Sequence, residues 1–221
     1  MTISVPRLDR SAAGERGITI ADFLVPVRVS DGIGVRLRHL ALILLGTLLI
    51  AAAAQVRFYL PGNPVPFTGQ TFAVLLAGGA LGFRRGIAAT SLYLLLGIVG
   101  LPVFADAKHG WEIVSGTTGG YLIGFILAGA LVGRLAELGW DRNLRGAVGA
   151  MLIGDVVIFA IGVPWLAIVA SGPPISASQP LDFAIANGLT PFLGAEILKL
   201  ALAAAAFPAA WWLVGRRPGD S

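Results

Sequence analysis

The sequence of 221 residues contains no cysteine. Disulfide bonds, thiolate metal sites and a cysteine nucleophile are therefore excluded. Charged residues are scarce as well, at 13% of the chain, which is about half the share that a soluble domain uses to solvate its surface. This shortage excludes an ordinary soluble enzyme, a disordered chain and a coiled coil.

Catalytic motifs are missing too. The chain has no G-x-x-x-x-G-K-[ST] phosphate-binding loop, no H-E-x-x-H zinc motif and no G-x-S-x-G nucleophile motif. Its two histidines, His39 and His109, do not belong to a metal-ligating set. We therefore expect that the chain is not an enzyme and has no catalytic residues, no metal site and no cofactor.

Apolar residues, in contrast, are abundant: they make up 56% of the chain, and its mean hydropathy is +0.83. They gather in six stretches, most of them close to the length that a helix needs to cross a bilayer core of about 30 Å. The stretches are Leu40–Val56, Gly69–Phe83, Gly86–Val103, Gly119–Leu138, Arg145–Val169 and Thr190–Val214. We predict an all-α membrane protein with six transmembrane helices. In the alternative, the short second stretch and the third form one re-entrant hairpin.

The basic residues are distributed unevenly between the connecting segments. If the N-terminus is cytoplasmic, thirteen of the 16 basic residues lie on the cytoplasmic side, as the positive-inside rule requires. Arg57 and Lys108 lie in outer loops, and Lys199 lies within the sixth stretch. We therefore predict a protein of the cytoplasmic membrane with both termini inside, whose basic excess orients it against the bilayer and binds no nucleic acid. The thirteen residues are Arg7, Arg10, Arg16, Arg28, Arg36, Arg38, Arg84, Arg85, Arg134, Arg142, Arg145, Arg216 and Arg217.

The chain divides into three segments on this basis. Residues 1–36 lack a long apolar run and are predicted to be a cytosolic extension, a composition compatible with disorder. Residues 37–215 form the transmembrane domain, and residues 216–221 form a cytosolic tail.

Small residues recur at intervals of four within several stretches, for example at Gly78, Gly82 and Gly86. This spacing lets helix backbones approach closely in lipid. We expect packing within the chain. The alternative is a docking face for a partner membrane protein, and Thr47 and Ala51 of the first stretch would suit such a face.

Three ionisable residues lie within the apolar stretches: Asp155, Glu196 and Lys199. Charged groups are costly at membrane depth and mark function by default. Glu196 and Lys199 are three residues apart and share a helix face, so we predict that they bind a small polar ligand. A structural ion pair and a proton relay through Glu196 and Asp155 are the alternatives. Asp155 is a further candidate for a ligand contact, and it either pairs with Lys199 or bonds to the backbone at a helix contact.

Several blocks of the sequence, taken in order, resemble the BioY family, the biotin-specific substrate-binding subunits (S components) of energy-coupling factor transporters. The resemblance covers roughly residues 40–215, which makes it far more specific than any single motif. The blocks are Ala54-Gln55, Val65-Pro66 with Gln70, Leu81-Gly82 with Arg85-Gly86, Gly100 to Phe104, Thr118 to Tyr121, Gly162 to Leu166, and Glu196 with Lys199.

The resemblance implies an S-component bundle that binds biotin in a cavity on the outer side, beneath outer loops. A transmembrane coupling subunit and two ABC-type ATPases would drive uptake, although some members of the family work alone, so a solitary or oligomeric protein is the alternative. An S component for another vitamin is a second alternative. An intramembrane enzyme using Glu196 and Asp155 is a distant third.

The family's acid-x-x-Lys pair, which contacts the ligand, corresponds to Glu196 and Lys199, with Glu in place of the usual Asp. Tyr121, Trp165, Gln70 and Thr118 are further candidates for ligand contacts. Each of these four has an alternative role as an interfacial anchor or a packing residue. The loop from Ala105 to Trp111 matches the family least well, so no ligand contact is assigned to it.

Overall fold

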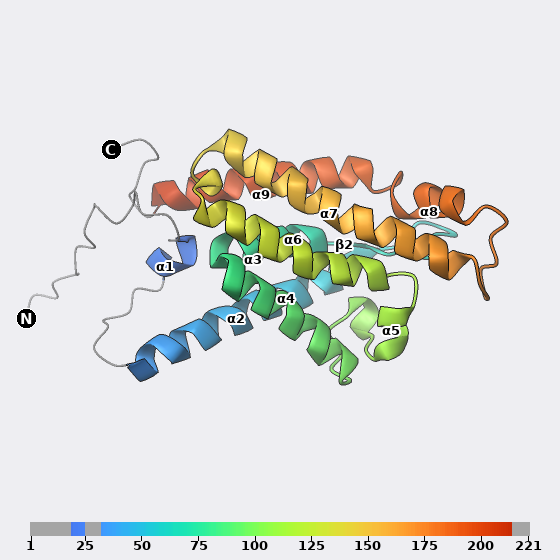
Figure 1. The fold of residues 1–221 in the computed structure, drawn as a ribbon, viewed down its shortest axis with the longest axis horizontal. Helices are drawn as coiled ribbons and strands as arrows, with labels where there is room; N and C mark the ends of the chain where they lie inside the picture. The colour runs from blue at the N-terminus through green and yellow to red at the C-terminus, as the bar shows by residue number, and fades with distance from the viewer. Residues whose placement is uncertain (1–18, 25–31, 214–221) are drawn as a thin grey trace, which may run out of the picture.

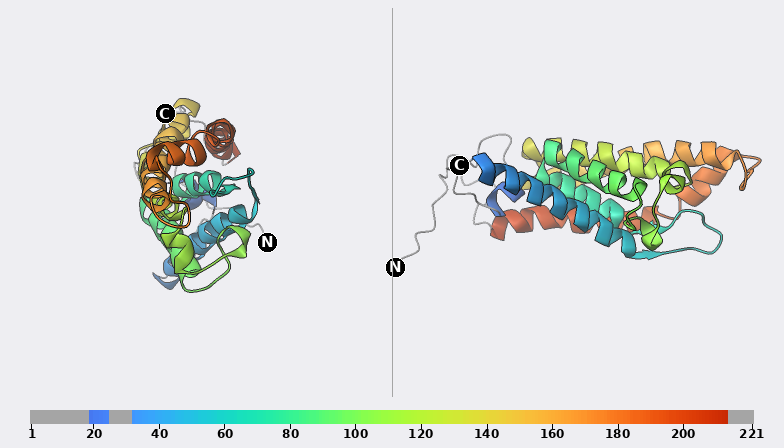
Figure 2. Two further views of the ribbon diagram at one scale, coloured as in Figure 1. Left: turned by 90° about the vertical axis from the view of Figure 1, so that its right-hand side faces the viewer. Right: turned by 90° about the horizontal axis from the view of Figure 1, so that it is seen from below.

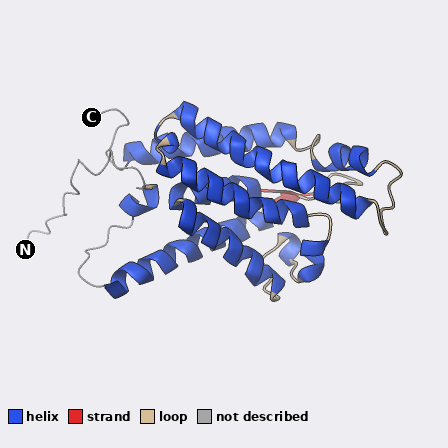
Figure 3. Cartoon of the chain, viewed as in Figure 1, coloured by secondary structure: helices blue, strands red, loops and turns tan. Residues whose placement is uncertain are grey.

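The computed structural model describes residues 19–24 and 32–213, and helices dominate this part of the chain (Figure 3). The prediction of a helical fold is therefore confirmed, with one short antiparallel ribbon added. The helices are α1 (Ile20–Leu24), α2 (Gly32–Gln55), α3 (Gln70–Leu81), α4 (Phe83–Ile98), α5 (Trp111–Ser115), α6 (Gly119–Glu137), α7 (Leu144–Ala170), α8 (Pro180–Gly188) and α9 (Leu193–Leu213). The ribbon consists of β1 (Arg57–Phe58) and β2 (Phe67–Thr68), and two 3₁₀ turns are η2 (Ala105–Ala107) and η3 (Trp140–Arg142).

A helix lies at each of the six apolar stretches. Four helices, α2, α6, α7 and α9, are long and apolar enough to cross a membrane, whereas α3 has 12 residues and α4 has 16. The helices form an elongated bundle (Figures 1 and 2). The start of α2 and the end of α9 lie at one end of it, with α1. The ribbon, α5 and α8 lie toward the other end (Figure 1), which we call the loop end.

Helix α3 is the central element of the bundle, since it packs against α2, α4, α6 and α9. Most of its residues are buried. The approach to α6 depends on glycine, because a Cβ at Gly78 would lie 2.6 Å from the carbonyl oxygen of Gly129. This confirms the expectation that the small-residue rows pack within the chain.

A single residue, Gly82, links α3 to α4. Its φ of +82° is a conformation that residues with side chains rarely adopt. The turn is also pressed against α6, where a Cβ at Gly133 would lie 2.5 Å from the carbonyl carbon of Gly82. The result is a tight helical hairpin.

The shortness of α3 has a structural explanation. Twelve residues span about 18 Å, and β2 extends the segment toward the loop end. Irregular backbone is tolerated at membrane depth only where protein surrounds it. Here the N–H of Gly69 donates to the carbonyl oxygens of Ala53 and Val56, at 3.1 and 3.0 Å.

Residues 19–24 differ from the expectation for the predicted extension 1–36, because they pack against the bundle. Thr19, Ile20 and Ala21 are buried. Asp22 accepts hydrogen bonds from Arg38 and Arg85 at 2.8 Å each. Desolvation by itself raises the pKa of Asp22, but the hydrogen bond from the Thr19 backbone and the charge of Arg85 outweigh it, so the pKa is lowered overall. The rest of the extension up to residue 18, and the tail 216–221, lie outside the described residues.

The proposed docking face at Thr47 is wrong. Thr47 is 2% exposed, and its hydroxyl donates to the carbonyl oxygens of Ile43 and Ala89. It therefore joins α2 to α4 inside the chain. The exposed side of α2 is instead a row of large residues that includes Leu40, Leu44 and Leu48.

Candidate functional site

A polar group of three side chains lies between α3 and α9 at the inner limit of a cavity. The ammonium of Lys199 lies 2.7 Å from Oε1 of Glu196 and 3.2 Å from the hydroxyl of Thr71. The Thr71 hydroxyl in turn lies 3.1 and 2.9 Å from the two carboxylate oxygens of Glu196. Glu196 is 2% exposed, and the side chain of Lys199 is 20% exposed. We call these three residues the floor group.

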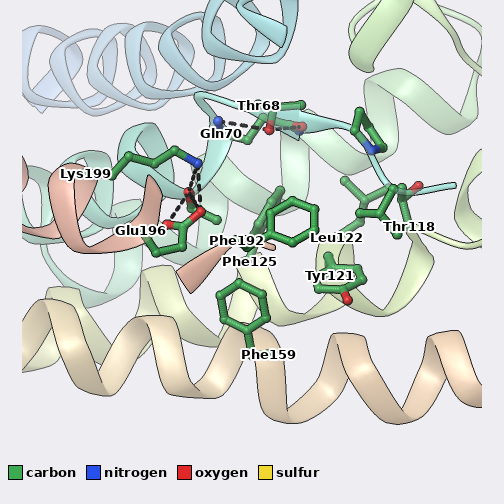
Figure 4. A pocket seen from close by; sticks show the side chains of 13 residues that line it. Thr68, Gln70, Thr118, Tyr121, Leu122, Phe125, Phe159, Phe192, Glu196 and Lys199 are labelled. Carbon is green, nitrogen blue, oxygen red and sulfur yellow. Dashed lines mark hydrogen bonds and ion pairs between the residues drawn. The ribbon is translucent and has the colours of Figure 1, made fainter. Parts of the chain in front are cut away.

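The cavity above the floor group holds about 450 Å³ of empty space, its open mouth included. Its walls combine aromatic and aliphatic side chains with a few polar ones (Figure 4). The lining residues are Val65, Pro66, Thr68, Gln70, Thr71, Thr118, Tyr121, Leu122, Phe125, Phe159, Phe192, Glu196 and Lys199.

Aromatic stacking fixes one wall of this cavity. Phe192 precedes Glu196 by four residues. Its ring stacks on the ring of Phe67, with the two ring centroids 4.0 Å apart. Phe67 stacks on Phe58 of β1 at 4.7 Å. The ring centroid of Phe159 on α7 lies 6.2 Å from that of Phe192 and 5.9 Å from that of Tyr121. These aromatic side chains come from five segments of the chain: β1, β2, α6, α7 and the residue before α9.

Gln70 stands at the first turn of α3. Its amide nitrogen donates to the hydroxyl of Tyr93 at 2.7 Å, and its oxygen accepts from Thr68 at 3.0 Å. Both ends of the side chain are thus held in the absence of ligand. The result is a rigid polar rim on the cavity.

A second cavity continues from the first toward the loop end, since Pro66, Gln70, Thr118 and Leu122 line both. It holds about 850 Å³, mouth included. Other residues that line it come from the β1–β2 loop and the segment between α4 and α6: Tyr59, Pro64, Phe104, Ala105, Lys108, Glu112, Ile113, Gly116 and Thr117. The two cavities are therefore neighbours with common walls, and the second lies on the loop-end side of the first.

Asp106 holds the two loops over this second cavity together. Its carboxylate contacts Arg57 and the hydroxyl of Tyr59, which both belong to the segment between α2 and α3. Within its own loop, between α4 and α5, the carboxylate lies 3.4 Å from the ammonium of Lys108. The hydrogen bond from Tyr59, followed by that from Arg57, lowers the pKa of Asp106. Burial and the same hydrogen bond raise the pKa of Tyr59 to about 12, so this hydroxyl remains a donor at neutral pH.

Five of the seven residues proposed as ligand contacts line the first cavity: Gln70, Thr118, Tyr121, Glu196 and Lys199. The hydroxyl of Tyr121 donates to the carbonyl of Gly188 at 2.8 Å, so the residue offers the ligand its ring face rather than its proton. The hydroxyl of Thr118 lies 3.4 Å from the carbonyl of Ile113.

The other two, Trp165 and Asp155, do not line this cavity. The indole nitrogen of Trp165 donates to the carbonyl of Gly116 at 2.9 Å, and its ring packs against Gly120, so it anchors the loop before α6. Asp155 is 8% exposed on α7, and no hydrogen-bond partner for its Oδ1 exists within the described part of the chain.

The sequence reasoning missed several lining residues. Phe192 precedes Glu196 by four residues, so helical spacing points to it. Thr71 directly follows Gln70 on α3, and helical spacing does not place neighbouring residues on one face. Phe159 follows Asp155 by four on α7. Lys108 and Glu112 fall in or beside the loop that was assigned no contact, and only the folded structure brings them over the cavity.

Comparison with known proteins identifies the family. The sequence profile of the BioY family matches residues 26–216. The chain belongs to the BioY family. The resemblance noted in the separate sequence blocks is thereby confirmed over most of the chain.

Relatives within the BioY family support this assignment. The biotin transporter BioY of Thermotoga maritima is 38% identical over 158 residues, which cover 72% of this chain and 86% of that protein. The biotin transporter BioY2 of Lactococcus lactis is 33% identical over 170 residues, covering 76% of this chain and 86% of that one. The crystal structure of the S component for biotin from an ECF-type ABC transporter superposes with a TM-score of 0.69 at 22% identity. It covers 82% of this chain and 94% of that one. This structural match shows that the chain has the fold of that S component.

Proposed function

We propose that this BioY protein binds biotin in the two neighbouring cavities and acts as the substrate-specific subunit of an energy-coupling factor type transporter. The observation that carries the proposal is the floor group, a buried acid, ammonium and hydroxyl beneath aromatic walls. The named relatives are transporters, which agrees with the prediction that the chain is not an enzyme.

The chemistry of biotin suits this arrangement. Its ureido ring carries two N–H donors and one carbonyl acceptor on a compact bicyclic body. The Glu196 carboxylate supplies acceptors for the N–H groups, and the Lys199 ammonium supplies a donor for the carbonyl. The ring system lies against Phe159 and Phe192. A neutral ring brings no charge of its own to an ion pair that is already balanced.

The acidic tail of biotin is then directed toward the loop end. An aliphatic chain extends past Leu122 into the second cavity, where the ammonium of Lys108 and the hydroxyls of Thr117 and Thr118 lie among the lining residues. This placement leaves the carboxylate near water and near a cation. We assign the tail to Lys108 and the ring to the floor group.

In the proposed topology the chain crosses the cytoplasmic membrane six times, and both termini lie in the cytoplasm. It is supported by the common end at which α2 begins and α9 ends, and by the arginines at that end, among them Arg84, Arg85 and Arg134. Helix α4 runs from the Gly82 turn at this end toward the loop end, which favours two crossings by α3 and α4 over a re-entrant hairpin. The loop end is then outside, and biotin reaches the floor group through the second cavity.

We further propose a transmembrane coupling subunit and two ABC-type ATPases as partners, because the chain has no phosphate-binding loop of its own. Co-purification from native membranes with an ATPase pair supports this assembly. Full uptake by the chain alone, in a host without such subunits, favours a solitary transporter instead.

Equilibrium binding to the purified protein tests the function. We expect tight binding of biotin and none of thiamin, which is cationic, or of riboflavin, whose ring is larger. Binding of another vitamin with no binding of biotin supports an S component of different specificity. The floor group favours biotin here, since a cationic ligand would meet the Lys199 ammonium.

A further inference from the structure

Among the described residues, Asp155 is a charged group near the level of the floor group that has no role in the ligand contacts proposed above. It lies on the face of α7 that packs against α3, α6 and α9. It is 92% buried, since 8% of it is exposed, and Oδ1 has no hydrogen-bond partner among the described residues. An ionised carboxylate without a partner is unstable when removed from water, so such a residue is retained for a reason other than packing.

Geometry places Asp155 at the level of the floor group. The rings of Phe159 and Phe192 lie 6.2 Å apart, and α7 and α9 run in opposite directions, so Asp155, one turn before Phe159, lies opposite Glu196, one turn after Phe192. Helix α3 has no titratable residue. Within α6, Arg134 pairs with Glu137 in the last turn, and Tyr121 lies in the first turn with its hydroxyl bound to Gly188. At the two ends of α7, η3 carries Asp141 and Arg142 and α8 carries Asp182. Among the described residues of these elements, Lys199 is therefore the cation at the level of Asp155.

Lys199 has donors to spare. An ammonium has three N–H groups, and two are directed to Glu196 and Thr71. A ligand whose N–H groups take the Glu196 oxygens competes with Lys199 for them. A lysine displaced from its acid inside the membrane needs another counter-ion, because an unpaired buried charge is strongly destabilising.

We propose that Asp155 is the alternative counter-ion of Lys199, ionised and paired with it when ligand occupies Glu196, and protonated when the site is empty. The inference rests on the proposed function, since it supposes a ligand with N–H donors at Glu196. Asp155 acts through Lys199 and is a positioning residue. Binding then releases one proton from Asp155, and affinity rises with pH over the range in which the empty site still holds that proton.

The test compares wild type, Asp155→Asn and Asp155→Glu in biotin-binding calorimetry and in thermal unfolding without ligand. Asn mimics the protonated acid, so the empty protein should unfold at the wild-type temperature or above it. Biotin affinity should fall about tenfold or more, the scale expected when one member of a buried ion pair is removed. The pH dependence of affinity should flatten. Asp155→Glu keeps the charge and should recover most of the affinity.

Asp141→Asn is the matched control, a buried aspartate in η3 at the opposite end, and its biotin affinity should equal that of wild type. Wild-type binding with equal affinity and pH dependence in Asp155→Asn overturns the inference and leaves the proposed function intact. So does a joint loss of stability and affinity that Asp155→Glu does not rescue. If wild type binds no biotin at all, the proposed function itself fails.

Discussion

The Glu196 carboxylate lies within hydrogen-bond distance of two side chains, with the Thr71 hydroxyl near both of its oxygens and the Lys199 ammonium near Oε1. The acid-x-x-Lys spacing on one helix face made this pair predictable from sequence. The third member was not, because Thr71 lies 125 residues away on α3. At the scale of single residues, the binding chemistry is set by side chains that different helices bring to one depth.

Asp141 offers a test of burial at this scale. Burial raises its pKa to about 6, against a smaller opposing effect of the hydrogen bond from Trp211 at 2.8 Å. A raised pKa in the folded state means that its stabilising effect is complete below about pH 4 and is lost as pH rises through about 6. We predict that Asp141→Asn, which still accepts from Trp211, removes this loss. Between pH 4 and pH 8, the free energy of unfolding of this variant should rise relative to that of wild type by up to about 3 kcal/mol. Unfolding measured at both pH values checks this, and an identical difference at the two would contradict it.

The Asp106 contacts predict a kinetic effect. Replacing Asp106 with Ala removes the acceptor shared by Arg57, Tyr59 and Lys108, so the loops above the second cavity should open more readily. We expect biotin to dissociate roughly 3- to 10-fold faster, with a smaller effect on the association rate. Because the pKa of Asp106 is lowered in the folded state, its contribution holds at neutral pH and is lost in acid as the carboxylate is protonated. Stopped-flow dissociation measures the effect, and an unchanged rate means that these contacts do not retain the ligand.

At the scale of elements, the central position of α3 depends on the contact between Gly78 and Gly129. We predict that Gly78→Ala destabilises the bundle by about 1–3 kcal/mol, because the added methyl group has no room. Gly194→Ala in α9 is the matched control, since nothing lies within 4 Å of its Cβ position, and it should be neutral or stabilising. Thermal unfolding in one detergent compares the two, and equal effects would contradict the packing argument.

Apolar runs predicted all six long helical elements and glycine spacing predicted their close packing, because both signals are local in sequence. Helix α5 was not predicted, since the hydrogen bond from Trp165 to Gly116 at its end is a long-range contact. The same limit explains Thr47, whose hydroxyl was assigned to a docking face but bonds to Ala89. Neither α1 nor its contact with Arg85 is visible from the sequence, because α1 has only five residues and the contact joins residues 63 apart in the chain.

At the scale of the whole molecule, the absence of cysteine makes the proposed topology directly measurable. We predict that Lys108→Cys, in the exposed loop at the loop end, reacts with a membrane-impermeant maleimide in intact cells. Arg84→Cys, in the exposed turn at the other end, should react only after the membrane is permeabilised. The reverse pattern would invert the proposed orientation, and labelling of both from outside would contradict the single crossing, by α4, that separates the two positions.

The measurement closest to the central claim is the biotin affinity of Lys199→Ala. This change removes the donor and leaves Glu196 buried without its cation. We predict a loss of affinity of about 100-fold or more. Arg134→Ala, which removes an exposed cation from the last turn of α6, should bind as wild type does. Tight biotin binding by wild type that Lys199→Ala retains in full would contradict the assignment of the floor group as the ligand site.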